Sequence, residues 1–196
     1  MITITDLTLM RDGREIICDF SEQIPAGSIT VIIGPNGCGK STLLAGIAGD
    51  IAPTKGRITV GGVEPAVTSA RELAMLRSMA IQNQFFTLGF TVTQTLEMAG
   101  PSTDVMEKLQ LTHIANRHVT TLSGGEAQRV SIAQAIAQNA DVLLLDEPFA
   151  AQDYESRVRI IELLRALAHV GKTIVVVAHS SESDLSWADK IIKDFT

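Results

Sequence analysis

A glycine-rich segment at residues 34–42 constrains the fold of this chain more than any other feature. Its members are Gly34, Pro35, Asn36, Gly37, Cys38, Gly39, Lys40, Ser41 and Thr42. Residues 34–41 fit the pattern GxxxxGK[ST], and they lie between a β-branched run that ends at Ile33 and a stretch with helical spacing. Glycines let the backbone wrap closely around an anion, and the next helix adds its positive N-terminal end. The segment predicts a phosphate-binding loop between a strand and a helix.

Two side chains of this segment suit a nucleoside triphosphate. We expect Lys40 to reach the β- and γ-phosphates of ATP, and the hydroxyl of Ser41 to be a ligand of Mg²⁺. The alternative is a glycine-rich turn with an incidental lysine. The strand before the segment and the helix after it favour the phosphate site.

An apolar strand at residues 142–145 ends in two carboxylates, Asp146 and Glu147. This pattern suits a Walker B site, in which Asp146 holds Mg²⁺ directly or through water and Glu147 orients or deprotonates the attacking water. The alternative is a core strand that meets solvent at its end. The phosphate loop upstream favours the Walker B interpretation.

A long helical pattern begins with a serine, two glycines and a glutamate: Ser123, Gly124, Gly125 and Glu126. A serine with two glycines at a helix start exposes backbone N–H groups, which makes a second candidate phosphate site. The alternative is a capping box with S-x-x-E spacing, which needs no ligand. Taken alone, the spacing favours the cap.

The rest of the chain alternates between strand and helix patterns. Expected strands comprise residues 2–9, 14–21, 28–33, 57–60, 78–82, 141–145 and 173–178, and expected helices comprise residues 41–48, 69–77, 92–98, 103–111, 123–138 and 155–170. Turn signals between the first three strands predict hairpins at the N-terminus. The helical patterns between residues 85 and 116 suggest an insertion, and the later alternation predicts a mostly parallel α/β sheet.

Charge and hydropathy argue against several function classes. The net charge is −6 and no basic run is present, which argues against a nucleic-acid partner. The longest apolar runs fall far short of the roughly 20 residues of a membrane span. Residues 1–9 alternate as a strand does and not as a signal peptide does, so we expect a cytoplasmic protein. Cys18 and Cys38 lack metal-ligand spacing, and we expect free thiols in a reducing compartment.

Together these segments resemble the ATP-binding cassette (ABC) ATPase family, with the family's motifs in their usual order along essentially the whole chain. The resemblance implies an α/β, P-loop NTPase (RecA-like) fold. It has a mostly parallel sheet core, an N-terminal antiparallel β-subdomain and a small α-helical subdomain. The resemblance also implies one domain over residues 1–196, with the core at 1–82 and 140–196 and the helical subdomain at about 83–139.

Three further residues take roles from this resemblance. Gln82 resembles the Q-loop glutamine, which senses Mg²⁺ and links the core to the helical subdomain, and Gln84 is the competing candidate. His179 resembles the switch histidine that contacts the γ-phosphate, although a lone histidine at a strand end is ordinarily a surface or capping residue. Asp153 resembles the aspartate of the family's D-loop, which we define here as residues 149–153.

The resemblance also implies partners. The family works as a head-to-tail dimer, so ATP on Lys40 of one subunit is closed over by Ser123 and Gly125 of another, in a homodimer or pseudo-dimer of cassettes. Such a dimer drives a transmembrane permease and lies on the inner face of the cell membrane. Residues 85–90 contain three of the six phenylalanines. In the family this segment contacts the permease, so exposed rings here would mark an interface. Packing in the core is the alternative for each ring.

Three departures from the family pattern concern binding and coupling. The position of the aromatic residue that stacks on adenine falls on Met10 or Arg11, and the guanidinium of Arg11 can lie flat on the base. The D-loop lacks the usual Ser and Leu before its aspartate, and Gln134 stands where an arginine is common. We expect altered coupling between sites and intact hydrolysis, because Glu147 and His179 are present.

Our main hypothesis is the ATP-hydrolysing subunit of an ABC transporter. The alternative is a non-transport cassette that acts on a soluble partner, against which stand the acidic charge and the absence of basic or coiled-coil arms. A nucleotide-binding regulator that hardly turns over is a third hypothesis, suggested by the altered D-loop. The transported substrate is not encoded here, because the translocation pathway belongs to the membrane subunits.

Overall fold

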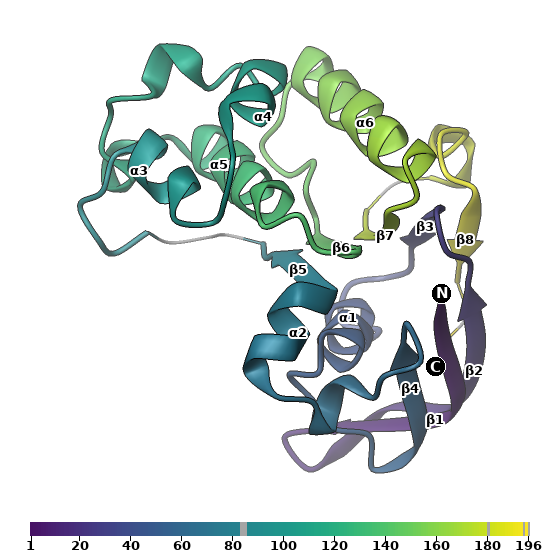
Figure 1. Cartoon of the computed structure of the whole chain (residues 1–196). Coiled ribbons are helices and arrows are strands. Elements are labelled where there is room, and N and C mark those ends of the chain that lie inside the picture. Colours follow the sequence, from purple (N-terminus) through teal and green to yellow (C-terminus); the bar gives the residue numbers. More distant parts are fainter. Residues whose placement is uncertain (83–85, 180, 194, 196) are drawn as a thin grey trace.

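The computed structural model describes residues 1–82, 86–179, 181–193 and 195 (Figure 1). An antiparallel sheet has the strand order β2-β1-β4, formed by β1 (Ile2–Arg11), β2 (Arg14–Ile24) and β4 (Lys55–Val60). The turn between β1 and β2 consists of Asp12 and Gly13, both with positive φ. Such two-residue turns match the twist of the strands that they join, so the expected hairpin forms here.

A parallel sheet of five strands has the order β5-β6-β7-β3-β8. Its strands are β3 (Ile29–Ile32), β5 (Arg77–Ala80), β6 (Val142–Asp146), β7 (Thr173–Val177) and β8 (Lys190–Ile192). The prediction that the third opening strand belongs with the N-terminal hairpins was wrong. All four residues of β3 are buried, as in a parallel strand covered on both faces, and β3 pairs with β7 and β8.

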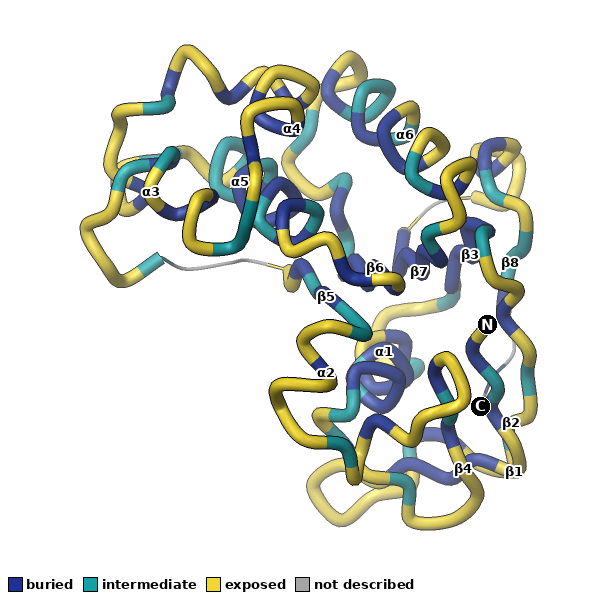
Figure 2. The backbone as a smooth tube through the Cα atoms, in the orientation of Figure 1, coloured by how far each residue is buried: buried dark blue, intermediate teal, exposed yellow. Residues whose placement is uncertain are grey.

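Helices cover both faces of the parallel sheet (Figures 1 and 2). They are α1 (Lys40–Ala48), α2 (Ala70–Leu76), α3 (Val92–Glu97), α4 (Thr103–Lys108), α5 (Gly124–Ala137) and α6 (Tyr154–His169). Most of the expected elements lie within three residues of their predicted ends. The short strand β8 was not predicted, because three residues are too few to reveal a period.

The side chains of β6 point alternately to the two faces of the parallel sheet, and each face packs against its own hydrophobic cluster. Leu143 and Leu145 pack with residues of α3, α5 and α6, whereas Val142 and Leu144 pack with α1 and the antiparallel sheet. A strand directs successive side chains to opposite faces, so one five-residue strand serves both clusters. Helix α1, which follows the glycine-rich segment, is thereby held between the two sheets.

Helices α3, α4 and α5 lie in the segment expected to form a helical insertion, and their buried side chains share a cluster with one face of the parallel sheet. The division into a core and a helical subdomain at about residues 83–139 stays a prediction. In the part of the chain that the structure describes, the helices lack the length and apolar character needed to cross a bilayer.

Gly56 in β4 lies where the β1–β4 register shifts, and its φ is +71°. A Cβ at this position would collide with the backbone carbonyl oxygens of Thr5 and Asp6. We expect Gly56→Ala to lower the free energy of unfolding by more than about 2 kcal/mol, measured by urea denaturation. Gly62→Ala is the matched control, because Gly62 has φ +86° and open space, so only the left-handed strain of about 1–2 kcal/mol applies. Equal losses in both variants would contradict this steric explanation.

Candidate functional site

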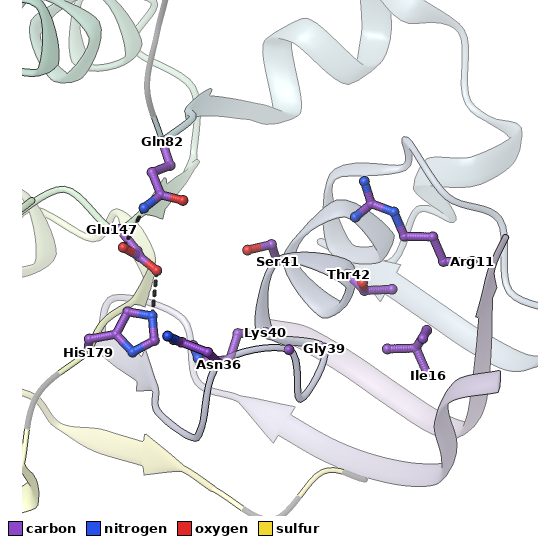
Figure 3. A pocket seen from close by; sticks show the side chains of 11 residues that line it. Arg11, Ile16, Asn36, Gly39, Lys40, Ser41, Thr42, Gln82, Glu147 and His179 are labelled. Atoms are coloured by element: carbon purple, nitrogen blue, oxygen red, sulfur yellow. Dashed lines mark hydrogen bonds and ion pairs between the residues drawn. The ribbon is translucent and has the colours of Figure 1, made fainter. Parts of the chain in front are cut away.

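A cleft of about 850 Å³ opens beside the N-terminus of α1 (Figure 3). It lies at the carboxyl ends of strands of the parallel sheet, where ligands of open α/β sheets bind. The residues that line it are Arg11, Ile16, Asn36, Gly37, Gly39, Lys40, Ser41, Thr42, Gln82, Glu147 and His179. The cleft therefore brings together residues of the glycine-rich segment, one of the two expected Walker B carboxylates, the expected Q-loop glutamine and the expected histidine.

Lys40 is the first residue of α1 and is only 5% exposed. Its ammonium group donates hydrogen bonds to the carbonyl oxygens of Gly34 and Pro35, both at 2.8 Å. These bonds stabilise a buried cation and hold it across the loop that starts after β3. Gly39, the residue before Lys40, has φ +100°, which favours glycine at that position.

Ser41 and Asp146 are 105 residues apart in sequence and meet at the floor of the site. The Ser41 hydroxyl donates a hydrogen bond of 3.2 Å to Oδ1 of Asp146, which is the last residue of β6 and is 8% exposed. Burial raises the pKa of the Asp146 carboxyl above its ordinary value, and the charge of Glu147 adds to this rise. The hydrogen bond from Ser41 and the charge of Lys40 oppose it.

The oxygen donors at this floor fit Mg²⁺ bound together with a nucleotide. Among the described residues, no group of three or more His, Cys, Asp or Glu side chains could hold a metal. Mg²⁺ in nucleotide sites takes only one or two protein oxygens and obtains the rest from phosphates and water. The hydroxyl of Ser41 and the carboxylate of Asp146 satisfy that requirement.

The carboxylate of Glu147 bridges two other side chains of the cleft (Figure 3). Its Oε2 accepts a hydrogen bond of 2.6 Å from Nε2 of Gln82, and its Oε1 lies 2.6 Å from Nε2 of His179. The order of the sheet explains this meeting. Gln82 follows β5, Glu147 follows β6 and His179 follows β7, and these three strands are neighbours. Gln84, the competing candidate, lies outside the described residues.

Glu147 also has a left-handed backbone, with φ +49°. Its N–H donates a hydrogen bond of 3.0 Å to the carbonyl oxygen of Val177 in β7, which holds this turn against the neighbouring strand. Left-handed φ is uncommon for residues other than glycine and is often found at functional sites. The turn aims the carboxylate into the cleft.

Ser123 and Glu126 form a complete capping box at the N-terminus of α5. Oγ of Ser123 accepts a hydrogen bond of 3.3 Å from the N–H of Glu126, and Oε2 of Glu126 accepts one of 2.7 Å from the N–H of Ser123. The capping interpretation is therefore correct for these two residues. Ser123, Gly124, Gly125 and Glu126 do not line the cleft of their own chain.

Asp153 lies outside the cleft as well. Its Oδ1 accepts a hydrogen bond of 2.7 Å from the N–H of Ser156 and caps α6. This backbone hydrogen bond lowers the pKa of the Asp153 carboxyl. The candidate site residues thus fall into two groups on one chain. One group lines the cleft or, like Gly34, Pro35 and Asp146, bonds to residues that line it, and the other lies at the starts of α5 and α6.

The capping box makes a pH-dependent contribution to stability. The N–H of Ser123 lowers the pKa of Glu126, and Arg117, at 2.8 Å from Oε1, lowers it further. This stabilisation is present above the ordinary glutamate pKa of about 4.3 and is lost as the pH falls through the lowered folded value. We expect Glu126→Ala to cost about 1–2 kcal/mol at pH 7 and less below pH 4, measured by urea denaturation.

The control for this prediction is Glu155→Ala, because Glu155 is an exposed carboxylate paired with Arg159 in a neighbouring turn of α6. Such exposed pairs contribute at most about 0.5 kcal/mol. A pH-independent cost of Glu126→Ala would contradict an ionic contribution from the capping box.

Sequence reasoning missed Ile16 of β2, which lines the cleft. Its Cγ2 lies 2.7 Å from where a Cβ of Gly39 would stand, so strand and loop are in close contact. The strand pattern contained only a weak signal, because Ile16 is a β-branched residue directly before the buried Ile17, and nothing in the sequence indicated its nearness to the loop. Of the two candidates for the base, Arg11 lines the cleft and Met10 does not.

Comparison with known proteins agrees with this geometry. The family model described as "ABC transporter" matches residues 17–150. The chain belongs to the ABC transporter family. The cassette is 33% identical to the hemin import ATP-binding protein HmuV of Bordetella pertussis, over 95% of this chain and 79% of that protein. It is 35% identical to the manganese transport system ATP-binding protein MntB of Listeria innocua, over 97% of this chain and 85% of that protein.

A solved dimeric structure of a bacterial ABC transporter cassette matches this cassette with a TM-score of 0.85 and 28% identity, over 98% of this chain and 93% of that one. A related dimer in a post-hydrolysis state with ADP and Pi matches with a TM-score of 0.84 and 27% identity, over the same shares of the two chains. The expected P-loop α/β fold is confirmed. The cassette is an ATP-binding and ATP-hydrolysing subunit of an ABC transporter, a class that powers a separate transmembrane partner.

Proposed function

We propose that this cassette hydrolyses Mg·ATP with Glu147 as the residue that orients the attacking water, and that hydrolysis drives import of a solute through a separate permease. The observation that carries the proposal is the bridge from Gln82 through Glu147 to His179, next to Ser41 and Asp146. An incidental anion site does not require a carboxylate held by two partners beside a phosphate loop.

The triphosphate lies in the 34–39 loop, with backbone N–H groups and the N-terminus of α1 directed at its oxygens. Lys40 contacts the β- and γ-phosphates from its position over the loop. Ser41 and Asp146 would hold Mg²⁺, with Gln82 as a further ligand. When bound, Mg²⁺ neutralises charge on the β- and γ-phosphate oxygens.

Glu147 accepts a hydrogen bond from the attacking water and takes its proton as the water oxygen bonds to the γ-phosphorus. The bond from that phosphorus to the β–γ bridging oxygen breaks, and ADP leaves. Gln82 and His179 restrict the orientation of the carboxylate, and His179 also contacts the γ-phosphate. Catalysis consists mainly of positioning and charge neutralisation.

The second group of candidate residues serves another copy. Ser123, Gly124, Gly125, Glu126 and Asp153 lie away from their own cleft. We propose that the start of α5 closes over ATP in the cleft of a second cassette, in a homodimer or pseudo-dimer. The likeness to a solved dimeric cassette supports this arrangement.

The permease partner is supported by relatives named as import or transport system ATP-binding proteins. Those relatives are named for different solutes, hemin and manganese, so their names do not assign a solute to this cassette.

Two exposed apolar side chains follow Gln82 in the chain. Leu88 is 63% exposed and Phe90 is 38% exposed, and we propose that these side chains contact the permease. Phe86 packs on the core, and Phe85 lies outside the described residues. The cassette would then lie on the cytoplasmic face of the membrane.

Affinity purification of the tagged cassette from detergent-solubilised membranes tests the transport role. We expect a multi-span membrane protein to co-purify, and Leu88→Glu with Phe90→Glu to abolish this while leaving ATP hydrolysis intact. Co-purification with ribosomes or nucleic acid in its place would support a non-transport cassette acting on a soluble partner.

We propose that the guanidinium of Arg11 stacks on the adenine of ATP and that the side chain of Ile16 packs against the same base. Exposed stacking of a guanidinium contributes about 0.5–1 kcal/mol, so we expect Arg11→Ala to raise the KM for ATP by about two- to fivefold with little change in kcat. Arg14→Ala is the matched control, because Arg14 pairs with Arg11 across the hairpin and does not line the cleft. An unchanged KM in Arg11→Ala would remove Arg11 from the base site.

A further inference from the structure

The D-loop has a defined shape between Glu147 and α6. The N–H of Ala150 donates to the carbonyl oxygen of Glu147 at 3.1 Å, and the N–H of Gln152 donates to that of Phe149 at 3.2 Å. Ala151 is left-handed, with φ +56°. These consecutive turns make the path from Glu147 to Gln152 short and compact, so a displacement of Gln152 moves the backbone that carries Glu147.

Phe149 anchors the start of this loop. Its ring and that of Trp187 form a T-shaped pair with centroids 5.5 Å apart, and the guanidinium carbon of Arg157 lies over the Phe149 ring, 5.2 Å from its centroid. The start of the loop is therefore held by these ring contacts.

The side chain of Gln152 bridges to the first two turns of α5. Its Oε1 accepts a hydrogen bond of 3.0 Å from Arg129, and its Nε2 donates one of 3.0 Å to the carbonyl oxygen of Gly125. Residues four apart lie on the same face of a helix, so one carboxamide reaches both. Nε of Arg129 is buried without an acceptor. The hydrogen bond from Nη1 of Arg129 to Gln152 therefore offsets part of the cost of burying this guanidinium.

Gly125 makes this approach possible. A Cβ at that position would lie 2.7 Å from the carbonyl oxygen of Ala151, closer than real Cβ atoms come to backbone oxygen. The second glycine at the start of α5 is thus required by the D-loop of its own chain, independently of any ligand.

The bridge requires an amide. Arg129 needs an acceptor and the carbonyl of Gly125 needs a donor, and a carboxamide offers an acceptor oxygen together with an NH₂ group. That NH₂ group also donates a hydrogen bond of 3.4 Å to the carbonyl oxygen of Ala150. Leucine offers neither. Glutamate retains the acceptor for Arg129 but turns a second oxygen toward the Gly125 carbonyl.

We propose that Gln152 is a positioning residue, which joins the start of α5 to the loop that carries Glu147 and so makes the orientation of Glu147 follow the position of α5. This inference rests on the proposed function of Glu147 and of the α5 start. Gln152 occupies the position where the family has a different residue, and the bridge explains how this D-loop holds its place without it.

Steady-state ATP hydrolysis tests the bridge in Gln152→Leu, Arg129→Met and the double variant. We expect Gln152→Leu to lower kcat about tenfold with KM within about twofold, because a misplaced carboxylate slows chemistry without altering the nucleotide cleft. The double variant loses no more than the more affected single variant. Gln152→Glu keeps the bond from Arg129 and loses less than Gln152→Leu.

Gln138→Leu is the matched control, because Gln138 joins the opposite end of α5 to the core through hydrogen bonds to the carbonyl oxygens of Ala74 and Arg77. Its kcat stays within about twofold of the parent chain. Equal losses in Gln138→Leu and Gln152→Leu, additive losses in the double variant, or a change in KM alone would each overturn the proposal.

Hydrogen exchange on the nucleotide-free chain provides a second measurement that does not depend on catalysis. We expect Gln152→Leu to speed exchange together at the amides of Ala150 and Gln152 and at Ala127, whose N–H bonds to the carbonyl of Ser123. Faster exchange confined to the D-loop overturns the bridge. If the parent chain together with its permease did not hydrolyse ATP, the proposed function would be refuted. The exchange measurement would still show whether Gln152 joins the D-loop to α5.

Discussion

Glu147→Gln lowers the rate of ATP hydrolysis by about 10²–10⁴-fold and leaves ATP binding intact. The substitution keeps the size of the side chain, so the contacts with Gln82 and His179 can persist in altered form, but an amide cannot take a proton from water. Lys40, Ser41 and Asp146 are unchanged in this variant, so ATP is still bound. The measurement is single-turnover hydrolysis together with ATP binding by calorimetry.

Glu162→Gln is the control for this prediction, because Glu162 is an exposed carboxylate on α6 that lies outside the ATP cleft. Its hydrolysis rate stays near that of the parent chain. A loss of less than about threefold in Glu147→Gln would contradict the assignment of the base and direct attention to another group in the cleft.

Lys40→Ala abolishes the ATP-dependent dimer that we expect Glu147→Gln to form. Lys40 is almost fully buried, and its removal takes away the cation opposite the triphosphate and leaves the carbonyls of Gly34 and Pro35 without their donor. Loss of a charged hydrogen bond of about 1.5–3 kcal/mol weakens ATP binding about 10–150-fold. Light scattering with Mg²⁺ and ATP measures the dimer, in Glu147→Gln and in Glu147→Gln with Lys40→Ala.

Lys108→Ala in the same Glu147→Gln background is the matched control, because Lys108 lies on α4 in an exposed pair with Asp104. Its dimer forms with ATP as before. A dimer that persists in Lys40→Ala would show that association does not depend on nucleotide. A monomer throughout, with ATP bound, would mean that α5 is only a capped helix or that closure requires the permease.

These two substitutions separate binding from chemistry. In the proposed mechanism, Lys40 acts on the triphosphate in its ground state, whereas Glu147 acts on water as the γ-phosphoryl bond breaks. The contacts of the two side chains differ accordingly: the Lys40 ammonium bonds within its own loop, and the Glu147 carboxylate bonds to Gln82 and His179, which follow the strands on either side.

Much of the candidate ATP site could be predicted from sequence, because the residues that define it lie close together in the chain. The loop at 34–42 needs glycines at fixed spacing and a lysine at the helix start, and both appear within nine residues. The carboxylates Asp146 and Glu147 follow a buried strand in the same local way. The Gln82 and His179 predictions came from resemblance, because a lone glutamine or histidine carries no pattern of its own.

The contacts that join distant segments could not be predicted in this way. Ile16 lies beside Gly39 and Gln152 beside Arg129 because of how the sheets and α5 pack, and neither pair has a periodic signal. The third opening strand was assigned to the wrong sheet for the same reason. Its apolar sequence is compatible with either sheet, and only its partners β7 and β8 decide between them.

The sequence by itself determined the glycine-rich loop before α1, the two carboxylates at the end of β6, the capped start of α5 and the α/β class, because each depends on residues close together in the chain. Only the tertiary structure decided that Gln82, Glu147 and His179 meet in one cleft and that the α5 start lies away from it. The physical reason is the strand order β5-β6-β7, which sets three strand ends side by side. The hydrophobic packing of complete helices and strands against one another selects that strand order, and a short stretch of sequence does not contain enough information to predict it.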